Sequence, residues 1–163
     1  MHSSMASLDA TDLKILAIMQ QNANYTTQEI ADRTNLSQSP CWRRINRLQE
    51  AGIIKKNVTL LNSQALGFDL VVFATINLTA QGRNSLTEFE EHIKRFPEVV
   101  ECYTMTGTWD YMLKIVAQGI RRYEAFVREH LLSLEQIREV HSHIAVTEIK
   151  NTTELPLSGS VSW

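Results

Sequence analysis

Apolar residues recur every three or four positions over the first sixty residues, which is the spacing of amphipathic helices. Asp9 is suited to cap a first helix. The Thr26-x-x-Glu29 capping box opens a second helix, and Ser37 caps a third helix that Gly52 ends. The pattern therefore predicts three short helices in succession.

The junction between the second and third helices is a tight turn at Thr34-Asn35-Leu36. Two short helices joined by such a turn have the layout of a helix-turn-helix. After the third helix, residues 53–61 are expected to form a strand or a hairpin wing. Residues 8–60 are thus predicted to be a winged helix-turn-helix domain.

Beyond residue 60 the pattern changes to strand, helix, strand, strand, helix, strand. The Ser85-x-x-Glu88 capping box is expected to open the first of these helices. This βαββαβ order is the ferredoxin-like arrangement, so the fold class is α+β, with a second domain over residues 61–157. The strands are expected over residues 70–78, 99–106, 111–117 and 140–149.

The first strand of the second domain is apolar on both of its faces. Val71 and Phe73 lie on one face, and Val72, Ala74 and Ile76 lie on the other. Two helices cover only one face of such a sheet, so the other face must meet another apolar surface. We expect a second copy of the chain there, which makes the protein a homodimer.

Charge is distributed unevenly along a chain whose net charge is −2. Residues 1–60 hold seven Lys or Arg against five Asp or Glu, and the remainder holds nine against thirteen. A basic first third indicates that this part meets an anionic polymer, although a difference of this size also arises by chance. The chain has no apolar run of membrane-spanning length and only two cysteines, so we expect a cytoplasmic protein with reduced thiols and no membrane contact.

The third predicted helix has two opposed faces. Cys41, Ile45 and Leu48 fall on the inward arc, and polar side chains that can bind bases or phosphates lie opposite, with Trp42 on one flank. Arg44 falls beside the inward arc, where it either grips a phosphate or pairs with a carboxylate. The alternative for the whole face is an ordinary solvated helix surface. The candidate residues for binding double-stranded DNA are Ser37, Gln38, Ser39, Trp42, Arg43, Arg44, Asn46 and Arg47.

The motifs occur in an order that resembles the leucine-responsive regulatory protein/AsnC (Lrp/AsnC) family. They are Leu8-Asp9-x-x-Asp12-x-x-Ile15-Leu16, Leu36-Ser37-x-Ser39-Pro40-Cys41-x-x-Arg44-Ile45-x-x-Leu48-x-x-x-Gly52-Ile53-Ile54, Thr106-Gly107-x-x-Asp110-Tyr111 and Ile149-Lys150-x-Thr152-x-x-Leu155-Pro156-Leu157. The resemblance covers about residues 8–157. It implies a transcriptional regulator with a sensor domain called RAM, dimers that often assemble into octamers, and an amino acid effector bound between sensor domains. The Pro40-Cys41-Trp42 run and the C-terminal motif are most similar to the branch that senses leucine, methionine or cysteine.

The turn over residues 106–110 could bind an amino acid. Its backbone N–H groups can bind a carboxylate, Asp110 can bind an ammonium, and Gly107 permits close approach of the backbone. In the resembling family this turn borders the effector pocket together with the last strand, whereas the simpler alternative is a plain β-turn. The family often has other residues at Trp109 and His143, so its selectivity does not carry over. The candidate effector residues are Thr106, Gly107, Thr108, Trp109, Asp110, Ser142 and His143.

Other functions have weaker support in the sequence. His141-x-His143 places two imidazoles on one strand face, but no supporting ligand has a suitable spacing, so we expect neither a metal nor a cofactor. Cys41 is expected in the core, and Cys102 is expected to be an ordinary strand residue. The alternatives to a regulator are a ferredoxin-like enzyme that binds amino acids and an RNA-binding module. The sequence lacks a phosphate loop, a nucleophile–base set and a basic-aromatic RNA-binding motif.

Overall fold

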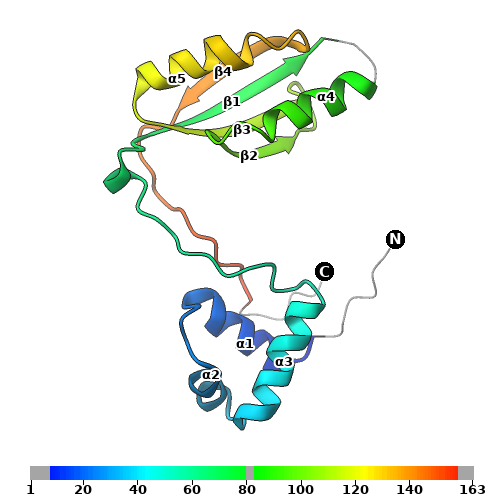
Figure 1. Ribbon diagram of the computed structural model, residues 1–163, viewed down its shortest axis with the longest axis vertical. Helices are drawn as coiled ribbons and strands as arrows, with labels where there is room; N and C mark the ends of the chain where they lie inside the picture. Colours follow the sequence, from blue (N-terminus) through cyan, green and yellow to red (C-terminus); the bar gives the residue numbers. More distant parts are fainter. Residues whose placement is uncertain (1–7, 80–82, 158–163) are drawn as a thin grey trace. The chain divides into compact units, whose positions relative to one another are not determined.

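A computed structural model describes residues 8–79 and 83–157 of the chain (Figure 1). For residues 83–85 it describes the backbone alone. The described chain divides into two compact units. The first contains residues 8–60 together with 150–157, and the second contains residues 61–149. The boundary near residue 60 agrees with the sequence pattern. Residues 150–157, which the sequence analysis placed in the second domain, belong with the first unit.

Three helices form the first unit: α1 (Ala10–Gln21), α2 (Thr27–Thr34) and α3 (Gln38–Glu50). The predicted caps at Asp9 and Thr26 are both present as complete capping boxes, and Ser37 is the N-cap of α3 without a side-chain cap hydrogen bond. Asn35 adopts a left-handed conformation (φ 55°) that reverses the chain between α2 and α3. The unit is therefore a helix-turn-helix.

The core of the first unit is small and comes from all three helices. Six apolar residues form it: Ile15, Ile30, Ala31, Cys41, Ile45 and Leu48. Cys41 is fully buried, as its position in the sequence predicted. The inward arc of α3 thus packs against α1 and α2, and this contact fixes which face of α3 points to solvent.

The strand predicted over residues 53–61 is not formed. These residues adopt no strand, and Val58, Leu60 and Leu61 are more than half exposed. A strand needs a partner for its backbone N–H and C=O groups. No described segment forms a ladder with residues 53–61, so they remain a connector without regular structure.

The C-terminal segment is attached to α1 by one side chain. Gln20 donates from Nε2 to the Leu155 carbonyl at 2.9 Å, and the Leu155 N–H donates to Gln20 Oε1 at 2.9 Å. An amide side chain that both donates and accepts in this way imitates a pair of backbone groups. This pair of hydrogen bonds explains why residues 150–157 group with the helices.

The second unit has the predicted ferredoxin-like topology. Its elements are β1 (Leu70–Leu78), α4 (Arg83–Ile93), β2 (Val99–Thr104), β3 (Tyr111–Ala117), α5 (Ile120–Phe126) with a π-helical turn η2 (Val127–Leu131), and β4 (Ile137–Ile144), preceded by a short 3-10 turn η1 (Gln64–Leu66). All pairs are antiparallel in the order β2-β3-β1-β4.

Three predicted boundaries in the second unit are shifted. β4 spans residues 137–144 instead of 140–149, because its pairing with β1 starts at Leu78 and the β1 strand offers no partner beyond the Val71 carbonyl. β2 ends at Thr104 instead of residue 106, where the chain enters the turn. α4 begins at Arg83, two residues before the predicted cap.

The two faces of the sheet differ in burial. Val72, Ala74 and Ile76 of β1 are fully buried against the helices, in one core with Phe89 and Leu113. Val71 and Phe73 of β1 are half-buried on the opposite face, where no described helix covers them. The register places Lys114 and His143 beside Phe73, and Met112 and His141 beside Thr75, on this same open face.

Candidate nucleic-acid interface and effector site

The outward face of α3 has the composition expected of a DNA-binding surface. Gln38, Ser39 and Arg43 are exposed, and Trp42 is 55% exposed. No hydrogen bond or ion pair joins Arg43 to another residue in the described part of the chain. Arg43 is therefore a cation that can reach a ligand without breaking an internal contact.

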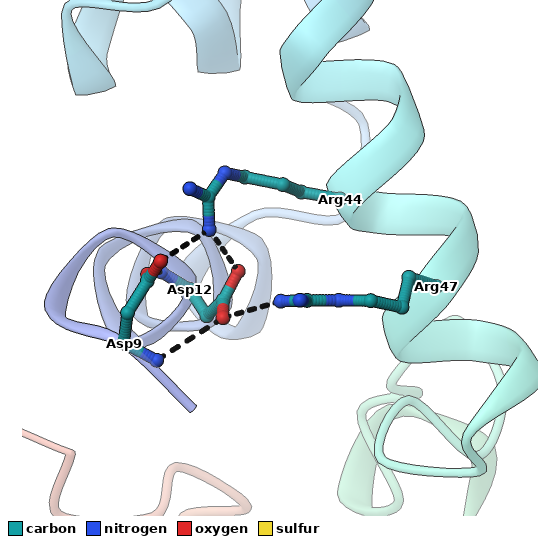
Figure 2. Close-up of polar contacts among 4 residues, drawn as sticks. All are labelled: Asp9, Asp12, Arg44 and Arg47. Atoms are coloured by element: carbon teal, nitrogen blue, oxygen red, sulfur yellow. Dashed lines mark hydrogen bonds and ion pairs between the residues drawn. The ribbon is translucent and has the colours of Figure 1, made fainter. Parts of the chain in front are cut away.

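Arg44 and Arg47 are engaged inside the unit. Asp12 of α1 is completely buried, and its carboxylate accepts from Arg44 Nη1 at 2.8 Å and from Arg47 Nη2 (Figure 2). Arg44 Nη1 also contacts Asp9 Oδ2 at 2.7 Å. The structure thus places Arg44 against carboxylates, which is one of the two roles that the sequence left open.

These contacts shift the pKa values of Asp9 and Arg44. The Asp12 backbone N–H, and after it the Arg44 guanidinium, lower the pKa of Asp9. The carboxylates of Asp9 and Asp12 raise the pKa of Arg44. Both shifts favour the charged forms, so the contact between Asp9 and Arg44 is an ion pair at neutral pH.

Sequence reasoning found Asp9 only as a helix cap and Asp12 only as a member of the first motif. Their partners on α3 are more than 30 residues away along the chain. No local sequence pattern predicts an ion pair between residues so far apart. The one usable signal was the position of Asp12, which falls three residues before the buried Ile15 on the same side of the helix.

The predicted sensor turn is an exposed loop closed at its base. The Met105 N–H donates to the Asp110 carbonyl at 2.8 Å, and Gly107 has a φ of +109°. Thr106 and Thr108 are exposed, whereas the half-buried Trp109 ring lies 4.6 Å from the ring of His141. The turn therefore presents backbone and hydroxyl groups next to the rings of Trp109 and His141.

Asp110 also has a structural role. Its Oδ2 accepts from the Leu78 N–H at 2.8 Å, and its own N–H donates to the Ile76 carbonyl at 3.0 Å and to Asn77 Oδ1 at 3.2 Å. These bonds attach the turn to the end of β1. Asn77, which is 5% exposed, was not among the predicted site residues.

Ser142 and His143 lie on opposite faces of β4. Ser142 Oγ is 2.5 Å from the Tyr123 hydroxyl of α5, under the helices, and His143 pairs with Phe73 in the register of the open face. The structure therefore does not bring Ser142 to the turn. His141 lies there instead, with its Nε2 at 2.6 Å from Glu139 Oε1, and the two-residue period of a strand could have indicated this.

Two further features of the described residues concern metal binding and membrane spanning. No group of three or more His, Cys, Asp or Glu residues among them is arranged to hold a metal ion. None of the described helices has the length and apolar character needed to cross a membrane.

Comparison with known proteins covers both units. A family model described as winged helix-turn-helix DNA-binding matches residues 8–55, and one described as the Lrp/AsnC ligand binding domain matches residues 71–155. The chain is 39% identical over 150 residues to the transcriptional regulator AzlB of Bacillus subtilis, covering 92% of this chain and 96% of that protein. It is 34% identical to the leucine-responsive regulatory protein of Rhizobium meliloti, with coverages of 92% and 96%.

Solved structures share the fold over nearly the whole chain. A transcriptional regulator of Neisseria meningitidis in complex with L-Met superimposes with a TM-score of 0.90 at 34% identity, covering 93% of this chain and 98% of that one. An AsnC family regulator of Agrobacterium tumefaciens superimposes with a TM-score of 0.89 at 39% identity, with coverages of 92% and 97%.

Proposed function

The chain belongs to the Lrp/AsnC family of transcriptional regulators, and from this premise we propose that α3 contacts DNA bases while the turn over residues 106–110 binds an amino acid. The family assignment favours a regulator over the ferredoxin-like enzyme and the RNA-binding module. Its named relatives are bacterial regulators, and bacterial DNA lies in the cytoplasm, so we propose that location.

The observation that carries the DNA proposal is the opposition of the two faces of α3. Its apolar arc is buried in the core, and its polar arc presents donors and acceptors to solvent. Side chains of this kind bind base edges and phosphates. We assign DNA contact to Ser37, Gln38, Ser39, Trp42, Arg43, Asn46 and Arg47, and we assign Arg44 to the internal ion pairs.

Substitution of Arg43 tests the DNA proposal. Arg43→Ala should weaken binding to a selected operator by roughly 1–3 kcal/mol if the side chain reads a base. Arg121→Ala is the matched control, because it removes an equal charge from an exposed position on α5. Affinities measured by fluorescence anisotropy should fall for the first variant only. Equal affinity of both variants and the wild type would show that Arg43 does not contact the operator, and the same result for Arg47→Ala would remove this face from recognition.

The effector proposal assigns the ammonium of the amino acid to Asp110 and its carboxylate to the backbone N–H groups of residues 106–109. The open turn, the φ of Gly107 and the adjacent Trp109–His141 pair support it. The Neisseria relative holds L-Met, which favours leucine, methionine or cysteine here. We leave Ser142 out of the site because its hydroxyl is paired with Tyr123.

A thermal-shift screen of the twenty amino acids tests the effector proposal. A ligand that binds only the native state raises the free energy of unfolding, by about 2.7 kcal/mol when its concentration is 100 times its Kd. The melting temperature rises as a consequence. We expect the largest shift with methionine, leucine or cysteine. A flat response to all twenty would end the sensor proposal and leave the DNA proposal intact.

A further inference from the structure

Asp12 is the one fully buried carboxylate among the described residues, and it extends from α1 to arginines of α3, the helix to which we assign DNA contact. A buried carboxylate is stable only when its oxygens are satisfied. Asp12 Oδ1 accepts from Arg44, and Oδ2 accepts from Arg47 and from the Asp9 N–H at 3.1 Å (Figure 2). A single carboxylate inside the unit thus fixes two guanidinium groups of α3.

The two arginines use this carboxylate differently. The Arg44 side chain is 30% exposed, and its Nη1 is shared between Asp9 and Asp12. The Arg47 side chain is 51% exposed, and only its Nη2 is bound by a described carboxylate. Because a guanidinium carries five N–H donors in a rigid plane, Arg47 keeps donors for another ligand while its plane is fixed by Asp12.

We propose that Asp12 is a positioning residue for DNA recognition, which holds the Arg47 guanidinium in one orientation at the exposed face of α3. Asp12 itself does not reach DNA. Arg44 completes the cluster through Asp9 and keeps α1 against α3. This inference rests on the proposed role of α3 in DNA binding.

The physical gain is preorganisation. A free arginine has many rotamers, and ordering them on binding lowers affinity. An arginine already held by a buried acceptor loses little further freedom, and its plane meets one base edge better than others. The Asp12–Arg47 pair should therefore contribute to discrimination between DNA sequences more than to attraction by the DNA backbone.

A double-mutant cycle on the full chain tests the proposal. The four proteins are the wild type, Asp12→Asn, Arg47→Ala and the double variant. The probes are a duplex enriched from a random pool by the wild type and a mixed-sequence duplex of equal length. We expect Asp12→Asn to weaken binding to the enriched duplex about tenfold when Arg47 is present and less than about twofold when it is absent.

The same measurements distinguish the alternatives. An equal loss in both backgrounds would show that Asp12 acts only on the stability of the unit, and it would overturn the proposal. A gain of affinity in Asp12→Asn would show that Asp12 withholds Arg47 from DNA, and it would overturn it too. If neither Arg43→Ala nor Arg47→Ala alters binding, the proposed role of α3 fails first.

Arg47→Lys is a second variant that leaves the core intact. It keeps the positive charge but lacks the planar fork. We expect unchanged affinity for the mixed-sequence duplex, an unchanged salt slope, and about a tenfold loss for the enriched duplex. Retention of full preference for the enriched duplex by Arg47→Lys would contradict the proposal even if Asp12→Asn fails to fold.

Discussion

At the scale of single residues, Asp110 combines an observed structural bond with the ammonium contact that we propose for it. Asp110 fixes the sensor turn to the end of β1 through Oδ2, and its second oxygen makes no hydrogen bond to a described residue. A simple truncation would remove both roles at once. The two can be separated by a variant that keeps the acceptor and loses the charge.

We predict that Asp110→Asn folds like the wild type but binds the amino acid at least about tenfold more weakly, because a neutral acceptor bonds an ammonium less strongly. Asp110→Ala should lose the ligand and also about 1 kcal/mol of stability, since the Leu78 N–H loses its partner. Calorimetry gives the affinity and urea unfolding gives the stability. Undiminished binding by Asp110→Asn would show that Asp110 does not hold the ammonium.

Residue-level prediction from the sequence succeeded where periodicity decided the answer. The burial of Cys41 and the exposure of Arg43 follow from the helical projection of α3. The partners of Arg44 could not be chosen, because Asp9 and Asp12 come into reach only when α1 and α3 pack. The structure separates Ser142 from His143 because adjacent residues of a strand face opposite sides.

At the scale of elements, local capping chemistry specified the helix starts. Asp9 and Thr26 were identified from sequence, and both make the expected bonds to the third residue of their helices. Strand ends were less predictable, since the extent of β4 depends on the length of its partner β1. The missing strand over residues 53–61 has the same cause: these residues have no neighbour to pair with in the described chain.

The charged cap of α1 gives a prediction about acid. Because the folded-state pKa of Asp9 lies below its ordinary value of 3.8, its ionised form stabilises the helix above that pH. The contribution is lost as the pH falls through the folded-state pKa. Asp9→Asn keeps a good cap without the charge. Hydrogen exchange of the α1 amides should therefore be slower in the wild type at about pH 7 and equal in both proteins at about pH 2.

Glu29 offers an independent test of the same rule. The Thr26 backbone N–H lowers the pKa of Glu29, so its stabilising effect on α2 should also fade in acid. Glu29→Gln retains the capping-box geometry. The measurement is again hydrogen exchange, here of the α2 amides. If Asp9→Asn or Glu29→Gln still differed from the wild type at low pH as much as at neutral pH, the cap charges would not govern the pH dependence of helix stability.

At the scale of the whole molecule, the fold class and the order of elements could be predicted because the period of the apolar pattern changes near residue 60. The C-terminal segment could not be assigned in this way. Its eight described residues are mostly exposed, and they join the first unit through Gln20. A side-chain amide that binds a distant backbone leaves no trace in the pattern of apolar residues.

The open face of the sheet yields the prediction on assembly. Val71, Phe73 and Lys114 are half-buried in a single chain, His143 beside Phe73 is exposed, and no described helix lies over them. A second copy would remove this apolar surface from water at about 25 cal/mol per Å². Phe73→Glu would remove the aromatic ring from that contact and put a carboxylate in its place, which is unfavourable to desolvate even beside Lys114. We therefore expect the wild type to be a dimer or a larger assembly, and Phe73→Glu to shift toward monomer.

Sedimentation at micromolar concentration measures this shift, and Leu132→Glu is the matched control. Leu132 is 62% exposed beyond the π-helical turn, so the same change there should leave the assembly intact. Phe73→Glu should also bind the operator more weakly, because a dimer presents two copies of α3 to half-sites about 34 Å apart, one helical turn of DNA. A wild type that sediments as a monomer would refute the assembly. If Phe73→Glu kept the wild-type mass, the contact would have to lie on another surface.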